Sequence, residues 1–323
     1  MANCNGCLKE NIEGFCPACE KKLFDRSKVP IKLKFNWNDI QDRILGQPEA
    51  FSISGVQAKG FIGRDKNNLL APNRDIESMY IIKPVLDSRR DLYMDSPANE
   101  HLTVTMANKV FNIKTALCCF IRFANNEPAY ITRRFDRDKT GRVLRQEDFA
   151  SVLNATPDPK NRGLYKYYSY TYEDVGNRLN PVDNINFIRV LIFNFLTGNG
   201  DAHLKNLSLL ESSDGDMIFS PSYDLMNTKL HINDSQIAMN LFREMERFGH
   251  DSSDIDYKYK IHDFYKLGER TGIKDKILKS IGEEFRSAEE AMQKLVEISF
   301  LSNPGKMKYK EVLKSHYKQL FSS

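Results

Sequence analysis

Two carboxylates and one amide stand at a spacing that suits phosphoryl transfer. Asp201 is followed five residues later by Asn206, and Asp224 lies eighteen residues after Asn206. In such enzymes one carboxylate orients a hydroxyl group or takes its proton, while an Asn and a second Asp hold the metal that bridges the nucleotide phosphates. The spacing favours Asp201 as the catalytic residue and Asn206 and Asp224 as Mg²⁺ ligands. For such a loop seen alone, a polar connection followed by an unrelated turn Asp is the favoured alternative.

The elements expected around these residues would bring them to one point. Residues 187–196 are mostly apolar, so we expect a buried helix that Gly198 ends. Residues 207–210 and 217–219 are short apolar runs on either side of an Asp-Gly pair at 214–215, which predicts a β-hairpin. A hairpin brings its open ends together, so the two metal ligands should face each other beside the catalytic carboxylate.

Upstream segments predict the other parts of a nucleotide site. Residues 52–60 are small and polar, with a Gly that lets the backbone approach phosphate. Residues 79–84 predict a strand that carries Lys83 at its end. The Ser-Pro pair at 96–97 predicts the N-cap and first residue of a helix, with Glu100 in its first turns. Protein kinases fix their phosphate-binding Lys by pairing it with a helix Glu.

Each of these features has an ordinary alternative that is favoured when it is taken singly. Lys83 could be a solvated strand end, and Glu100 a carboxylate favoured by the helix dipole. The complete order of loop, Lys, Glu, Asp, Asn and Asp along one chain is hard to obtain by chance, and it therefore favours a nucleotide site.

These motifs resemble those of the HipA family of bacterial Ser/Thr kinases, the toxins of toxin–antitoxin pairs. The matching segments run from about residue 50 to about residue 245 and are SISGVQAKG, YIIKP, NEHLTVTMANKVFN, YITRRFDR, QEDFASVLN, GNGDAHLKN and SPSYDLMNT. The resemblance implies an α+β, two-lobed, protein-kinase-like fold. Its small β-rich N-lobe falls on residues 26–135, and its all-helical C-lobe on residues 136–323.

The resemblance also implies roles for single residues. Asp201 falls on the family's catalytic Asp, and Lys83, with Glu100 as its partner, falls on the phosphate-contacting Lys. The two metal ligands fall on Asn206 and Asp224. The other positions of the ATP site are Ser54, Gly55, Val56, Gln57, Ala58 and Lys59 in the phosphate loop, Arg133, Arg134 and Phe135 in the segment that holds adenine through backbone groups, and His203, Lys205 and Tyr223 in the two catalytic motifs.

In the family a Ser of the phosphate loop is autophosphorylated, which displaces the loop and switches the kinase off. Ser52 corresponds to that position, and Ser54 is a second candidate because short relatives called HipT carry the same Ser-x-Ser pair. Full-length HipA has an extra N-terminal subdomain of roughly a hundred residues, a typical domain size. Only about fifty residues precede the loop here, so the chain resembles the short branch, in which the missing piece is a separate small protein.

Residues 1–25 are expected to form a small zinc knuckle. Cys4 and Cys7 form one CxxC pair, and Cys16 and Cys19 form a second pair after eight residues. Four thiolates in two tight pairs suit a structural, tetrahedral Zn²⁺ site with no open position for catalysis. The alternative is four reduced thiols in a frayed N-terminus. The adjacent cysteines at 118–119 lie in an apolar run and are expected in the core.

Composition fits a cytoplasmic enzyme. The 323 residues are 41% hydrophobic, which is enough for two lobes with their own cores. No apolar run reaches membrane length, no signal peptide opens the chain, and CxxC pairs then point to the reducing cytosol. The net charge is only +4. The Lys residues at 306–318 are interpreted as a solvated helix face, so neither membrane nor direct nucleic-acid binding is expected.

The sequence thus predicts an ATP- and Mg²⁺-dependent Ser/Thr protein kinase, regulated by autophosphorylation and acting as a toxin. From the resemblance alone, its substrate would be a protein such as an aminoacyl-tRNA synthetase. Its partners would be a small DNA-binding antitoxin, a separate small protein equivalent to the missing subdomain, or both. One alternative is a small-molecule or lipid kinase, because the motifs report phosphoryl transfer and not the acceptor. A non-catalytic pseudokinase is a second alternative, and the intact set of site residues argues against it.

Overall fold

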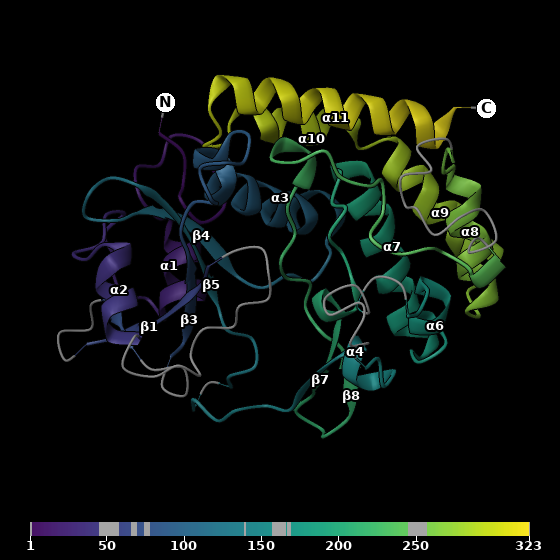
Figure 1. Ribbon diagram of the computed structural model, residues 1–323, viewed down its shortest axis with the longest axis horizontal. Helices are drawn as coiled ribbons and strands as arrows, with labels where there is room; N and C mark the ends of the chain where they lie inside the picture. The colour runs from purple at the N-terminus through teal and green to yellow at the C-terminus, as the bar shows by residue number, and fades with distance from the viewer. Residues whose placement is uncertain are drawn as a thin grey trace. The chain divides into compact units, whose positions relative to one another are not determined.

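The structure is a computed structural model that describes residues 2–44, 58–65, 70–73, 78–138, 140–156, 166, 169–244 and 257–322. The chain divides into two units (Figure 1). The first consists of Met1–Thr105, Ala116–Val143 and Lys294–Lys306, and the second of Met106–Thr115, Leu144–Gln293 and Met307–Ser323.

The first unit is built on a five-stranded antiparallel sheet with the strand order β2-β1-β3-β5-β4. The strands are β1 (Gly60–Arg64), β2 (Leu70–Pro72), β3 (Tyr80–Lys83), β4 (Cys118–Arg122) and β5 (Pro128–Arg133). Strands β4 and β5 form a hairpin whose turn contains Asn126 in the left-handed region, at φ 71°. The sheet places Lys83 opposite Tyr130 at the end of β3.

Two short helices of the first unit, α1 (Pro17–Phe24) and α2 (Trp37–Ile44), belong to the same hydrophobic core as the sheet. Phe24 is fully buried and its ring lies 5.8 Å from that of Tyr80 in β3. Cys119 of β4 is also fully buried, as its apolar surroundings in the sequence predict. The core therefore extends from the sheet into the cysteine-rich N-terminus.

Helix α3 (Ser96–Phe111) agrees with the predicted helix, but Ser96 is not its N-cap. A 3₁₀ turn at Tyr93–Asp95 precedes it, and Ser96 already has helical angles, φ −58° and ψ −41°. The Ser96 hydroxyl instead accepts from the Leu86 N–H at 2.9 Å and donates to the Tyr93 carbonyl at 2.7 Å. The extra turn continues the helical path upstream, so the cap predicted from the Ser-Pro pair is wrong.

The second unit is organised around α7 (Pro181–Thr197), most of whose residues are buried. Asn180 caps its start, and Gly198 ends it in the left-handed conformation. The remaining helices are α4 (Phe149–Val152), α6 (Tyr172–Gly176), α8 (Ile261–Arg270), α9 (Asp275–Arg286), α10 (Glu289–Glu297) and α11 (Asn303–Phe321), of which α10 and α11 extend into the first unit.

The second unit is not wholly helical, because it also contains a three-stranded antiparallel sheet in the order β6-β7-β8. Strands β7 (Ser208–Glu211) and β8 (Met217–Phe219) form the predicted hairpin, with Gly215 in the left-handed turn. Strand β6 (Gln146–Asp148) comes from a polar segment for which no strand was expected. It is held there because Phe149, directly after it, is fully buried and donates its N–H to the Leu207 carbonyl at 3.0 Å.

Within the part of the chain that the structure describes, no helix combines the length and apolar character needed to cross a membrane.

We predict that His316 makes the folding stability depend on pH. The ring is buried, and its Nδ1 lies 2.6 Å from the Phe195 carbonyl oxygen. Burial lowers the pKa of His316 to about 4, against about 6.5 for an unfolded chain. The neutral ring is therefore favoured in the folded state, and its stabilising contribution is lost as pH falls from 6.5 towards 4. The loss from this group approaches about 1.4 kcal/mol per pH unit.

The measurement is urea unfolding between pH 4 and pH 8 on wild type and His316→Asn, which keeps a donor but does not titrate. The variant should show a flatter profile below pH 6.5. Parallel profiles would contradict the prediction.

Candidate phosphoryl-transfer site

The first unit contains the predicted Lys–Glu pair. Lys83 is the last residue of β3, and Glu100 lies in the second turn of α3. Their Nζ and Oε1 atoms are 2.7 Å apart, and the side chains are 11% and 1% exposed. A buried pair of this kind fixes the position of the ammonium group, because moving either partner leaves the other charge uncompensated.

Residues 133–135, predicted to hold adenine, come at the end of β5 and after it. The N–H of Arg133 donates to the Leu117 carbonyl at 2.7 Å, and that of Arg134 to the Met79 carbonyl at 2.9 Å. These two N–H groups are therefore used within the protein and do not point to a bound base. Any backbone contact with adenine from this segment would use its other polar groups.

The side chains of the same two residues are also engaged. Arg133 donates to Asp25 Oδ1 at 2.8 Å. Arg134 pairs with Asp136 at 2.8 Å, and Arg137 contacts the same carboxylate at 2.7 Å. Burial raises the pKa of Asp136, but the two guanidinium groups outweigh it, and the net shift is downward.

The phosphate loop lies mostly outside the described residues. This applies to Ser52, Ser54, Gly55, Val56 and Gln57. The described end of the loop is Ala58, which is exposed, and Lys59, which is half-buried and leads into β1.

In the second unit the chain turns sharply from α7 into the loop that carries Asp201. Asn199, which is buried, donates from Nδ2 to Asn194 Oδ1 at 3.0 Å and accepts at Oδ1 from the Asp201 N–H at 3.2 Å. The Gly200 N–H donates to Thr228 Oγ1 at 2.9 Å. These bonds fix the backbone on both sides of Asp201, whose side chain is 25% exposed.

The two predicted metal ligands lie around one small cavity. Asn206 donates from Nδ2 to the Asp201 carbonyl at 2.8 Å, so its Oδ1 is the atom suited to a metal. Asp224 has a left-handed backbone, φ 58°, and follows Tyr223, which donates to the Lys205 carbonyl at 2.9 Å. Asn206 and Asp224 both line a cavity of about 10 Å³, close to the room that one water molecule needs. An oxygen donor pair at such a cavity suits Mg²⁺.

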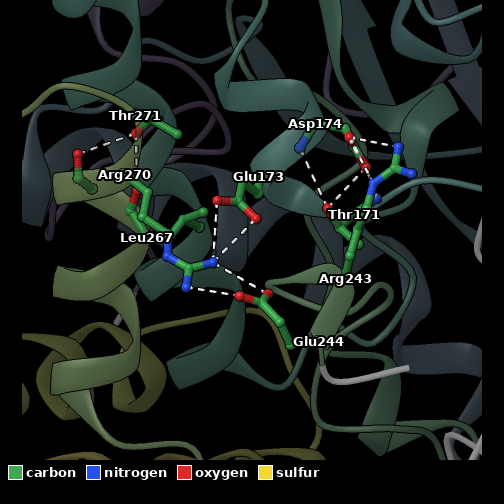
Figure 2. A network of polar contacts seen from close by, with 9 residues as sticks. Thr171, Glu173, Asp174, Arg243, Glu244, Leu267, Arg270 and Thr271 are labelled. Carbon is green, nitrogen blue, oxygen red and sulfur yellow. Dashed lines mark hydrogen bonds and ion pairs between the residues drawn. The ribbon is translucent and has the colours of Figure 1, made fainter. Parts of the chain in front are cut away.

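A polar network holds α6 against its neighbours in the second unit (Figure 2). Thr171 and Asp174 form a capping box, and Arg243 pairs with Asp174 at 2.9 Å. Figure 2 also shows Arg270 between Glu173 and Glu244, at 3.3 and 2.8 Å. Helix α6 in turn contacts the catalytic loop.

Helix α6 presents Tyr172 to the catalytic loop. The Tyr172 hydroxyl donates to the Ala202 carbonyl at 2.9 Å, and its own N–H donates to the Asn240 carbonyl at 3.0 Å. The partly exposed ion pairs around it contribute little each. The backbone bond and the buried tyrosine therefore do most of the positioning.

Sequence reasoning missed Lys166, which lies beside His203. Lys166 Nζ is 2.7 Å from His203 Nε2, and the same nitrogen is 3.7 Å from Asp201 Oδ1. Burial, helped by the Lys166 charge, lowers the pKa of His203 to about 4, so the ring is neutral at physiological pH. Lys166 lies within a tyrosine-rich stretch at residues 165–172, and no local pattern in the sequence points to its contact with His203.

The four N-terminal cysteines converge. Their Sγ atoms all lie within 4.8 Å of one another, and Cys7 and Cys16 are 3.8 Å apart. Four Zn–S bonds of about 2.3 Å directed to the corners of a tetrahedron give S···S separations of about 3.8 Å. Hydrogen bonds from Cys19 and Cys7, joined by the Cys16 N–H at 3.2 Å, lower the pKa of Cys4 and favour its thiolate. The donor set therefore fits Zn²⁺.

The sheet with its Lys–Glu pair and the helical unit with its Asp-x₄-Asn loop define a protein-kinase-like fold. The chain belongs to the HipA-like C-terminal domain family, whose pattern matches residues 51–292. The structure of HipA from Shewanella oneidensis MR-1, solved with HipB and operator DNA, shares this fold with a TM-score of 0.61 and 19% identity, over 87% of this chain and 70% of that one. The family predicted from the motifs is confirmed.

Relatives in sequence carry kinase names. "Putative kinase Y4dM" of Sinorhizobium fredii is 31% identical over 62% of this chain, and the Ser/Thr-protein kinase toxin HipA of Shewanella oneidensis is 29% identical over 62%. A "Putative kinase" of Haemophilus influenzae is 24% identical over 92% of this chain and 90% of its own length. This chain spans only about half the length of the first two, 51% and 48%.

We predict that Glu100→Gln destabilises the first unit by leaving the Lys83 ammonium without its buried counter-charge. Breaking a buried pair costs about 3–5 kcal/mol in unfolding free energy. The Lys83→Met, Glu100→Gln double variant should lose less unfolding free energy than the two single variants lose in total, because it contains no uncompensated buried charge.

The measurement is a double-mutant cycle by urea unfolding, with Glu13→Gln as the control. Glu13 is exposed, so its variant should stay within about 0.5 kcal/mol of wild type. If the loss of unfolding free energy in the double variant equals the sum of the losses in the two single variants, the pair is not coupled.

Proposed function

We propose that the chain is an ATP- and Mg²⁺-dependent Ser/Thr protein kinase. The observation that carries the proposal is the catalytic loop, in which Asn206 is bonded to the Asp201 backbone and shares a cavity with Asp224. That arrangement supplies a partly exposed carboxylate beside a pair of metal-binding oxygens, the parts that phosphoryl transfer needs.

In the proposed reaction Asp201 accepts the proton of a Ser or Thr hydroxyl. The hydroxyl oxygen forms a bond to the γ-phosphorus as the bond from that phosphorus to the β–γ bridging oxygen breaks, and ADP leaves. Asn206 Oδ1 and the Asp224 carboxylate would hold Mg²⁺, which neutralises phosphate charge. Lys83, held by Glu100, binds phosphate oxygens.

The finer parts of the proposal come from the relatives. The toxin name of the Shewanella protein and its solved complex with HipB and operator DNA support a toxin role and a DNA-binding antitoxin as partner. A protein substrate such as an aminoacyl-tRNA synthetase, and a cytoplasmic location, are proposed from the family resemblance of the motifs alone. A separate small protein, of the kind found with the short branch that the motifs resemble, would be a second partner. Autophosphorylation of Ser52 or Ser54 would add nearly two negative charges where ATP phosphates bind and so inhibit the kinase.

The cysteine cluster is proposed to hold one structural Zn²⁺. Besides the convergence of the sulfur atoms, the segment is joined to the sheet, since Asn5 donates to the Phe120 carbonyl at 2.9 Å and accepts from its N–H at 2.8 Å. A metal would stabilise a segment that is too short to bury a core of its own.

Asp201→Asn and Asp224→Asn should each lower phosphoryl transfer by about 10²–10⁴-fold, because the first removes the proton acceptor and the second a charged metal ligand. The measurement is transfer from γ-labelled ATP to a generic Ser/Thr substrate and to the protein itself. Mass spectrometry should find phosphate at Ser52 or Ser54 in wild type only.

Asp216→Asn is the matched control, since this Asp is exposed in the β7–β8 turn and should behave as wild type. Circular dichroism should show all three variants folded. An Asp201→Asn enzyme with wild-type transfer would refute the assignment of the site.

Zinc should be present at about one atom per chain, and Cys4→Ser or Cys16→Ser should release it and lower the melting temperature of the first unit. Elemental analysis of protein purified without chelators measures this directly. Cys118→Ala, a change outside the cluster, should keep the metal. Zinc-free wild-type protein would refute the site.

A further inference from the structure

Lys166 and Asp201 both lie close to the same nitrogen atom of His203. Lys166 Nζ is 2.7 Å from His203 Nε2, and that nitrogen is 3.7 Å from Asp201 Oδ1. A lysine ammonium only donates hydrogen bonds, so His203 accepts at Nε2 and carries its proton on Nδ1. A positive charge thus stands beside the carboxylate proposed to take the hydroxyl proton.

The imidazole itself adds no charge. His203 is almost fully buried, and its Nε2 accepts the hydrogen bond from Lys166, so the ring is in its neutral form. Burial, with the charge of Lys205 acting in the same direction, lowers the pKa of Lys166, and the Asp201 and Asp224 carboxylates oppose part of that shift. Among the described residues around Asp201, Lys166 is the cation that makes a hydrogen bond to the catalytic loop's histidine.

A second residue close to Lys166 in the sequence is also bonded to the catalytic loop. Six residues on, Tyr172 donates to the Ala202 carbonyl at 2.9 Å, and Thr171 closes the capping box with Asp174 (Figure 2). The approach of Lys166 to His203 is therefore the second contact between the same two segments, and not an isolated one.

His203 forms a weaker hydrogen bond with Lys166 than a phosphoryl oxygen would form in the proposed reaction. A neutral imidazole gives an ordinary hydrogen bond, whereas a phosphoryl oxygen gives a charge-assisted one, roughly twice as strong. In the transition state, charge is spread over the three equatorial oxygens of the transferred group. A cation that gains its stronger partner only there lowers the barrier instead of tightening substrate binding.

Resting on the proposed kinase function, we propose that Lys166 is a further catalytic residue, whose ammonium group leaves His203 and binds the transferred phosphoryl group beside Asp201. The bonds made and broken are those of the transfer itself, namely hydroxyl oxygen to phosphorus formed and phosphorus to bridging oxygen broken. Lys166 keeps its proton throughout, and the hydroxyl proton goes to Asp201.

The test uses the full-length chain and the variants Lys166→Met and Lys166→Arg. Lys276→Met, an exposed residue of α9, is the matched control. The readouts are the single-turnover rate with γ-labelled ATP, the Kd of a fluorescent ATP analogue, and the melting temperature. Losing one charge contact to the transition state should slow Lys166→Met by about 10²–10³-fold. Its nucleotide Kd should stay within about threefold of wild type, and Arg should restore part of the rate.

A purely structural role gives a different result. In that case Lys166→Met would have a lower melting temperature and a weaker nucleotide affinity as well as a lower rate. Lys166→Arg would not restore the rate. That result, or a Lys166→Met enzyme with the wild-type rate, overturns the proposal while leaving the kinase function intact. A wild-type protein that transfers no phosphate to any acceptor overturns both.

Discussion

The catalytic loop depends on how one buried helix ends. Helix α7 is held by its apolar residues, and its last turn closes at Gly198 in the left-handed conformation, φ 71°. A side chain there would meet Val312 at 2.8 Å and Asn227 at 3.1 Å, so both the backbone angle and the space require glycine. Because the turn is fixed, Asn199 reaches back to α7 and forward to Asp201. The hydrophobic packing of α7 therefore determines where the Asp201 carboxylate lies.

In the first unit the corresponding constraint is the carboxyl end of α1. The last carbonyls of a helix have no partner within it. Here Arg133 donates to the Lys22 and Leu23 carbonyls at 3.0 and 3.2 Å, the Tyr80 hydroxyl donates to Leu23 at 2.8 Å, and Arg64 bonds the Phe24 carbonyl. Residues from three strands thus hold the cysteine-rich segment. If that segment binds zinc, the metal stabilises the sheet that carries Lys83 as well as the N-terminus.

Local patterns predicted the elements well, and long-range pairing decided the rest. The apolar run before Gly198 and the Asp-Gly hairpin each carry their signal within a few residues, so helix α7 and strands β7 and β8 follow from the sequence. Strand β6 does not, because only its partner β7 and the burial of Phe149 make it a strand. The same holds for Lys166, whose contact with His203 joins residues thirty-seven positions apart. The Arg133 and Arg134 N–H groups likewise had partners that only the sheet reveals.

On the proposed function, Lys83 and Lys166 are held by partners of different kinds. Lys83 is paired with an almost fully buried carboxylate, which is costly to separate, so its ammonium group stays in one place. Lys166 rests on a neutral ring, and releasing it leaves no buried charge behind. The first arrangement suits a group that binds the nucleotide before and after transfer. The second suits a group that changes partners during it, because the ring left behind is neutral.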